Sequence, residues 1–235
     1  MLKNVIANGM LVFAAVIGCA TSANAQNSGQ QTLNFTLGYF TPLGFDARDP
    51  DDVLFANSSY LLFDVKDFNG ASVGGEWLVP LGEHVEGGIG VSFSRRTVPS
   101  IYLDFVDPNG TEVDQDLRLR MVPLQFTVRL IPTGQRSPVQ PYIGAGVGII
   151  NWRYSESGEF IDFGAGNVIF TDSFVKTGSN AGPVVLGGIR FAGDSASAGF
   201  EIKYQKALGD LDANFAAPKI DLGGWTYNFT AGIRF

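Results

Sequence analysis

The sequence holds one cysteine and one histidine in 235 residues, and these scarcities exclude several kinds of protein. The lone Cys19 can form neither an intramolecular disulfide nor a cysteine-based zinc site. The formal net charge is -7 and no run of lysine and arginine offsets it, so we expect no nucleic acid partner. No apolar run reaches the roughly 20 residues that a transmembrane helix needs.

What the sequence does contain is a long alternating segment at its C-terminus. From Trp225 to Phe235 every odd position is apolar and every even position is polar or glycine. Side chains of a strand point to opposite faces in turn, so this strand has one apolar and one polar face. A closing strand of this kind that ends on phenylalanine resembles the insertion signal of bacterial outer-membrane barrels. The residues expected to form that signal are Tyr227, Phe229, Gly232, Ile233 and Phe235.

Residues 1–25 have the composition of a cleaved signal peptide. Lys3 supplies the positive start, residues 10–17 form the apolar run, and Ala23 and Ala25 fit a small-x-small cleavage site. Cleavage there leaves residues 26–235 as the mature protein. An alternative is a lipoprotein cleavage box that ends on Cys19, which would leave that cysteine lipidated.

Eight segments beyond the signal peptide alternate with period two, and most are about ten residues long, as tilted membrane strands are. This predicts an all-β fold, an eight-stranded antiparallel up-and-down transmembrane β-barrel. A soluble barrel such as a lipocalin alternates too, but aromatic residues gather near the strand ends here, as in the girdles of membrane barrels. The expected strands are 31–40, 71–81, 86–97, 118–131, 141–154, 182–192, 197–207 and 222–235. The expected girdle residues are Tyr39, Phe40, Trp77, Trp152, Tyr154 and Trp225.

The connections between these strands alternate in length. In outer-membrane barrels the short turns lie in the periplasm and the long loops lie outside the cell. Both chain ends are then periplasmic, and the external loops are approximately 41–70, 98–117, 155–181 and 208–221. The alternation loses its phase near Pro123 and near Asn151 and Trp152, where we expect bulges or the membrane boundary.

Several phrases resemble the broad family of small outer-membrane β-barrels that includes OmpA-type and OmpW-type proteins. They are residues 123–130, 141–149 and 187–191, together with the terminal Phe235. The resemblance implies a porin-like architecture in the cell outer membrane of a Gram-negative bacterium. It also implies contact with outer-membrane lipid and lipopolysaccharide, insertion by the barrel-assembly machinery, and a monomer. It is specific for architecture and not for role, because one fold hosts many functions.

The polar face of the strands places charged side chains in the barrel lumen. An eight-stranded barrel is just wide enough for side chains to fill, and buried charges must be paired. One interpretation is a salt-bridge plug, and the other is a narrow, anion-leaning pore. The expected lumen network is Glu76, Arg129, Arg190, Glu201, Lys203 and Arg234.

The remaining features leave three hypotheses for function. The first is a structural or surface-binding protein that acts through its external loops, which are acidic and, in 54–63, partly apolar. The second is a narrow channel for small solutes or ions. The third is an envelope-lipid-modifying enzyme, which the placement of His84 in a periplasmic turn disfavours. We therefore expect no enzymatic activity, no catalytic residue, no cofactor and no metal site.

Overall fold

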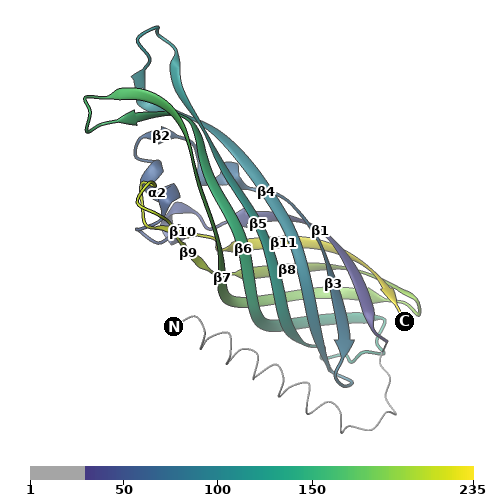
Figure 1. Cartoon of the computed structure of the whole chain (residues 1–235). Helices are drawn as coiled ribbons and strands as arrows, with labels where there is room; N and C mark the ends of the chain where they lie inside the picture. The colour runs from purple at the N-terminus through teal and green to yellow at the C-terminus, as the bar shows by residue number, and fades with distance from the viewer. Residues whose placement is uncertain (1–29) are drawn as a thin grey trace.

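The computed structural model describes residues 30–235 and confirms the expected barrel (Figure 1). Neighbouring strands pair antiparallel in chain order, and β1 closes the ring by pairing with β11. The expected signal peptide and Cys19 lie outside the described residues. The eight strands of the ring are β1 (Thr32–Pro42), β3 (Gly70–Pro80), β4 (Val85–Val106), β5 (Glu112–Leu130), β6 (Val139–Asp162), β7 (Val168–Ala192), β8 (Ala196–Gln205) and β11 (Gly224–Arg234).

The wall of the barrel has two heights. Strands β3, β1, β11 and β8 are neighbours and have 10 or 11 residues each, enough to cross a bilayer when tilted. Strands β4 to β7 have 19 to 25 residues and project as two hairpins, as Figure 1 shows. Most of the segments 98–117 and 155–181, which we expected to be loops, is therefore strand. The turns that remain are 107–111 and 163–167.

Two loops fill the space beside the tall strands. The first connects β1 to β3 and the second connects β8 to β11. Their buried apolar side chains pack with those of β4, β5 and β6 in one cluster. None of the helices within residues 30–235 is long and apolar enough to cross a membrane. The short elements of the two loops are η1 (Phe45–Ala47), α2 (Val53–Asn57), β2 (Leu61–Leu62), η2 (Val65–Phe68), β9 (Leu208–Asp210) and β10 (Lys219–Asp221).

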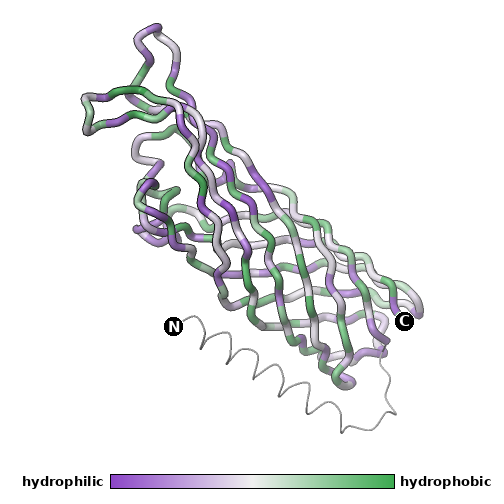
Figure 2. Tube along the Cα trace, in the orientation of Figure 1, coloured by the Kyte–Doolittle hydropathy of each residue, from purple (hydrophilic) through white to green (hydrophobic). Residues whose placement is uncertain are grey.

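An apolar belt surrounds the lower half of the barrel, and Figure 2 shows how apolar and polar positions alternate along each strand. Phe35 and Phe229, for example, are 62% and 69% exposed, whereas their chain neighbours Asn34 and Asn228 are buried in the lumen. A continuous ring of outward-facing apolar side chains is suited to contact with the hydrocarbon layer of a membrane. The belt includes Leu33, Leu37, Val73, Ile89, Val91, Val128, Ile143, Val147, Val185 and Ile202.

Of the two alternatives that we expected near Pro123 and Asn151, bulges or the membrane boundary, the structure shows no bulge. The register between β5 and β6 runs without a shift from Gln115 to Leu130, and the one shift between β4 and β5 lies between Ile101 and Val106. The same side of β5 therefore faces inward from Gln115 to Leu130, and the same holds for the residues of β6 that pair with it. What changes is the chemistry of that side, which is polar within the belt and apolar above it.

The inward-facing residues above the belt account for the loss of phase in the sequence. The outer face there carries exposed charged residues such as Arg120 and Arg153, and the two loops fill the interior, so the apolar side chains turn inward. Trp152 and Tyr154 belong to this interior and are not girdle residues, whereas Tyr39, Trp77 and Trp225 do face outward. The inward-facing apolar residues of β5 and β6 are Leu117, Leu119, Met121, Ile150, Trp152 and Tyr154.

Replacement of Leu117 by alanine tests this reversal. Leu117 is 0% exposed, so we expect Leu117→Ala to lower the free energy of unfolding by about 2–5 kcal/mol. The neighbouring Asp116 faces outward, and Asp116→Ala should change it by less than about 0.5 kcal/mol. Urea unfolding of the refolded barrel in detergent micelles measures both. Equal effects of the two variants would contradict an apolar interior at this level.

Candidate functional site

Arg129 is the centre of a charged network that crosses the lumen inside the apolar belt. Its side chain comes from β5 and is 1% exposed. Its Nη2 lies 2.6 Å from both carboxylate oxygens of Glu76 on β3 and 2.7 Å from Glu201 Oε2 on β8. Nη1 lies 3.7 Å from Glu86 on β4. One guanidinium therefore ties together strands from opposite sides of the ring.

Two further cations complete the network. Arg190 of β7 donates from Nη2 to Glu86 Oε2 over 2.9 Å and from Nε to Gln140 Oε1 over 2.7 Å. Lys203 of β8 lies 3.2 Å from Glu201 and donates to the side-chain oxygen of Gln125 over 2.7 Å. Charge-assisted hydrogen bonds of this kind satisfy the buried charges, which would otherwise be very costly.

Aromatic and glycine residues shape the space around Arg129. Its guanidinium carbon lies 4.8 Å from the ring centre of Tyr142, and the Tyr142 hydroxyl donates to Glu201 Oε2 over 3.2 Å. Gly144 stands beside Arg129 in the register of β5 and β6. A Cβ at Gly144 would lie 3.0 Å from Arg129 Cγ and 2.7 Å from the Val128 carbonyl oxygen, so a larger residue would displace the arginine.

Five of the six residues expected in the lumen network lie in it, and Arg234 does not. Arg234 lies at the turn end of the barrel, where it donates to the carbonyl oxygen of Gly193. Glu86 belongs to the network and was missed, although its position in the alternation of β4 was enough to place it in the lumen. With Glu86 included, the three cations face three carboxylates. The network is thus balanced in charge and not anion-leaning.

The first loop closes the barrel above this network. Asp52 caps the N-terminus of α2, accepting hydrogen bonds from the backbone N–H groups of Leu54 and Phe55. Arg48 Nε donates to Asp52 Oδ1 over 2.7 Å, and both side chains are fully buried. Arg48 Nη2 also donates to the Asp221 carbonyl oxygen over 2.7 Å, which fastens the first loop to β10. Burial raises the pKa of the Asp221 carboxyl.

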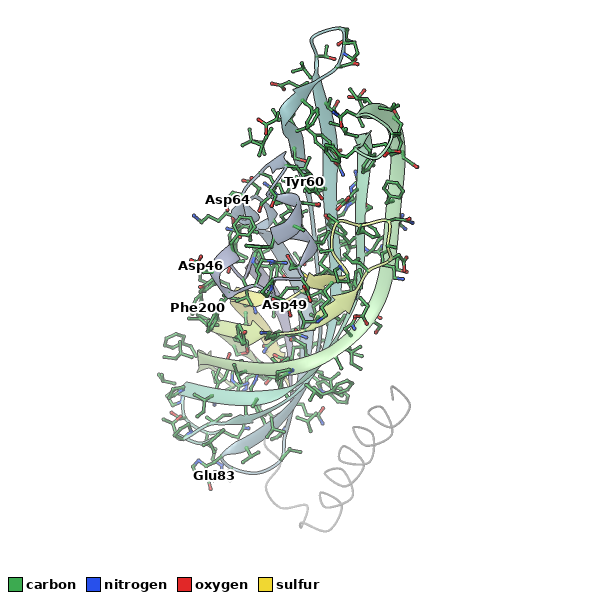
Figure 3. The ribbon with its side chains drawn as sticks, turned by 90° about the vertical axis from the view of Figure 1, so that its left-hand side faces the viewer. Asp46, Asp49, Tyr60, Asp64, Glu83 and Phe200 are labelled. Carbon is green, nitrogen blue, oxygen red and sulfur yellow. The ribbon has the colours of Figure 1, made fainter. Side chains whose placement is uncertain are left out.

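A second set of buried polar contacts joins α2 to the tall strands. Asn57 Nδ2 donates to Glu156 Oε1 over 2.7 Å, and the Tyr154 hydroxyl donates to the same oxygen over 2.8 Å. Tyr60 donates to Asn57 Oδ1 over 2.6 Å, and burial together with nearby Glu156 raises the pKa of its phenol. In Figure 3, Tyr60, Asp46, Asp49 and Asp64 lie far from Glu83, which marks the turn end.

Paired charged side chains occupy the lumen within the belt, and packed apolar side chains of the loops lie above them. A hollow of about 40 Å³ separates the charged network from the apolar cluster, and this holds only a few water molecules. Glu76, Gln125 and Lys203 line it below, and Met121 and Leu222 line it above. The polar network and the apolar cluster thus lie on either side of one small hollow.

His84 and Asp52, which the sequence also singled out, make structural contacts. His84 follows Glu83 in the turn before β4, and its Nδ1 is 3.1 Å from the Ile131 carbonyl oxygen. Asp52 is one of the acidic residues of the first loop. It caps the N-terminus of α2 and forms an ion pair with Arg48. Among residues 30–235, no group of three or more histidine, cysteine or acidic side chains is arranged to hold a metal ion.

Comparison with known proteins supports the architecture. No family model and no curated protein matches the sequence. Among solved structures, the outer membrane protein OprG from Pseudomonas aeruginosa has a TM-score of 0.53 at 12% identity, over 88% of this chain and 96% of that one. Ail, the attachment invasion locus protein of Yersinia pestis, has a TM-score of 0.46 at 13% identity, over 89% of this chain and 100% of the Ail chain.

The chain has the fold of a small bacterial outer-membrane β-barrel. Identities this low speak for the fold alone. The outward apolar belt of this chain independently fits a barrel embedded in the outer membrane.

Removal of the central guanidinium tests the energetic role of the network. Arg129→Met leaves Glu76, Glu86 and Glu201 buried without their shared cation, so we expect a loss of about 3–5 kcal/mol in the free energy of unfolding. The double variant Arg129→Met/Glu76→Gln should recover part of this loss, with a coupling energy of about 0.5–3 kcal/mol. Urea unfolding in micelles measures both, and strictly additive effects would contradict a direct coupling.

Proposed function

We propose that this protein is a closed outer-membrane barrel with a structural or surface-binding role, exerted through the part that projects outside the cell. The observation that carries the proposal is the contact of Arg129 with Glu76 and Glu201 across the lumen at 2.6 and 2.7 Å. A narrow barrel filled by paired charges is rigid and leaves little room for a solute.

The projecting hairpins support a role at the surface. Their tips carry large apolar side chains that are 39–65% exposed, and exposed apolar groups of this kind commonly take part in binding. A rigid barrel that presents such segments is a usual arrangement for recognition. The exposed tip residues are Leu103 and Val106 on the β4–β5 hairpin and Phe163, Val168 and Phe170 on the β6–β7 hairpin.

The proposal includes the partners that the resemblance implies. Outer-membrane lipid and lipopolysaccharide surround the belt, and the barrel-assembly machinery inserts the chain through its closing strand. Phe229, Ile233 and Phe235 of the expected insertion signal face outward and are 57–69% exposed, as groups that meet another molecule during assembly would be. We propose a monomer and a non-enzymatic role, because the lumen groups are committed to one another and His84 lies at the turn end.

Conductance of the refolded barrel in a planar bilayer tests the closed state. We expect the native protein to remain silent under conditions in which a general porin shows openings, after a heat-shifted gel band has verified folding.

One result of this experiment would favour the narrow channel instead. Discrete, reproducible openings of the native barrel, with an ion selectivity that changes in Glu201→Gln, would overturn the closed state. Deletion of 48–63 is a less direct test, because Leu54 and Leu61 of this segment are buried in the core and their loss destabilises the outer half.

A further inference from the structure

Three arginines lie side by side on the outside of the barrel. Arg120 of β5 stands directly opposite Arg95 of β4 on one side and Arg153 of β6 on the other. All three are exposed, and they point away from the lumen. Arg118 lies on the same face of β5, two residues farther from the periplasmic turns. Together with Ser155, these residues line a surface hollow of about 250 Å³. We refer to Arg95, Arg120 and Arg153 as the arginine row.

The arginine row is electrostatically unfavourable by itself. Like charges directly opposite on neighbouring strands destabilise a sheet. Within residues 30–235, none of the three forms an ion pair with a carboxylate, although the protein as a whole carries a net charge of -7. Arg118 Nε donates to Thr97 Oγ1 over 3.0 Å, which holds its guanidinium at the side of the row. Asp116 and Asp114 follow Arg118 farther out on β5. An anion that binds between the arginines would remove the repulsion.

The height of the row on the barrel indicates which anion this is. Phe93, which is 43% exposed, lies on the same face of β4 two residues below Arg95. Val122 has the same relation to Arg120 on β5. On β6 the exposed Asn151 lies between Arg153 and Ile149, which is four residues below the arginine. The outer face is therefore cationic at the row and becomes apolar within two to four residues below it. The free-energy cost of an outward-facing charge is small at this level of a membrane, where the acyl chains end and the headgroups begin.

We propose that the arginine row binds the phosphorylated sugar headgroup of an outer-leaflet glycolipid, with the acyl chains lying along the belt below it. Neighbouring strands are about 4.8 Å apart, so the row presents three guanidinium groups over about 10 Å. Each can donate two parallel hydrogen bonds to a phosphate, which a lysine cannot do. A free phosphate would use the cations alone, whereas a lipid also uses the adjoining apolar surface.

Thermal unfolding of the barrel in micelles, with and without lipid A that carries both phosphates, tests the proposal. We expect lipid A to raise the unfolding temperature of the native protein and to do so less at high salt, since screening weakens exposed charge pairs. The variant Arg95→Gln/Arg120→Gln/Arg153→Gln should lose the lipid-dependent shift. In the absence of lipid it should unfold no earlier than the native barrel, because the repulsion within the row is gone.

A matched control removes the same number of charges elsewhere on the outer part of the barrel. Lys66, Lys206 and Lys219 belong to the first and last loops and lie outside the row, so Lys66→Gln/Lys206→Gln/Lys219→Gln should keep the full shift. Equal loss of the shift in both triple variants would overturn a specific site. If the arginine triple variant does not fold, Arg120→Gln and Arg120→Lys replace it. We expect Arg120→Gln to weaken lipid A binding about tenfold, because it removes a charge-assisted contact. Arg120→Lys should weaken it less, because a lysine keeps the charge but lacks the paired donors.

The choice of probe separates a lipid site from a free anion site. Monophosphoryl lipid A should bind more weakly than the diphosphoryl form, and inorganic pyrophosphate should give no shift at the same concentration. A shift with pyrophosphate as large as with lipid A would overturn the lipid assignment. The result is independent of the conductance experiment, because the row lies outside the barrel and the charged network lies inside it.

Discussion

The absence of water in the hydrocarbon layer is the constraint on which this structure depends. A strand there cannot leave N–H and C=O groups unpaired, so the sheet must close, and β1 pairs with β11 to leave no edge. Eight strands enclose a space only as wide as the side chains within it. Inward-facing charges then have no solvent, and they persist only if they meet opposite charges at close range. The contacts of Arg129 with Glu76 and Glu201 follow from ring size and burial together.

Much of the barrel could be predicted from the sequence because its period is local. Within the membrane, successive side chains of a strand face the lipid and the lumen in turn, so the pattern can be recognised in each segment by itself. All eight strands and their up-and-down order were therefore predicted. Glu86 could have been included by the same count, since it shares its face with Gly88 and Gly90. Pairing across the ring is different. That Arg129 meets Glu201, which is 72 residues away, depends on the tilt and register of strands that no single segment encodes.

The outer half was predicted less well. The surroundings of both faces of each strand change there: the outer face passes from lipid to water, and the inner face passes from a polar lumen to an apolar core. The prediction assumed that apolar side chains face outward along the whole of every strand. Above the membrane the outside is water, and apolar residues such as Leu119 and Trp152 face inward. The change of phase was interpreted as a bulge or the membrane boundary, and the residues beyond it were predicted to be loops, so the length of β4 to β7 was underestimated. The apolar residues of 54–63 were a usable signal, since such a loop needs an apolar surface to cover.

The reversal on the inner face and the arginine row on the outer face occur at the same level of the barrel. On β5, Leu119 and Met121 turn inward on either side of Arg120, and on β6, Trp152 and Tyr154 do so on either side of Arg153. A strand with strict alternation can change the chemistry of both faces at once only if its surroundings change on both sides. Outside, lipid tails give way to headgroups and water. Inside, paired charges give way to the packed loops. The two boundaries coincide, so the same few residues of β5 and β6 mark where the membrane ends, hold the cap in place and present cations to the leaflet surface.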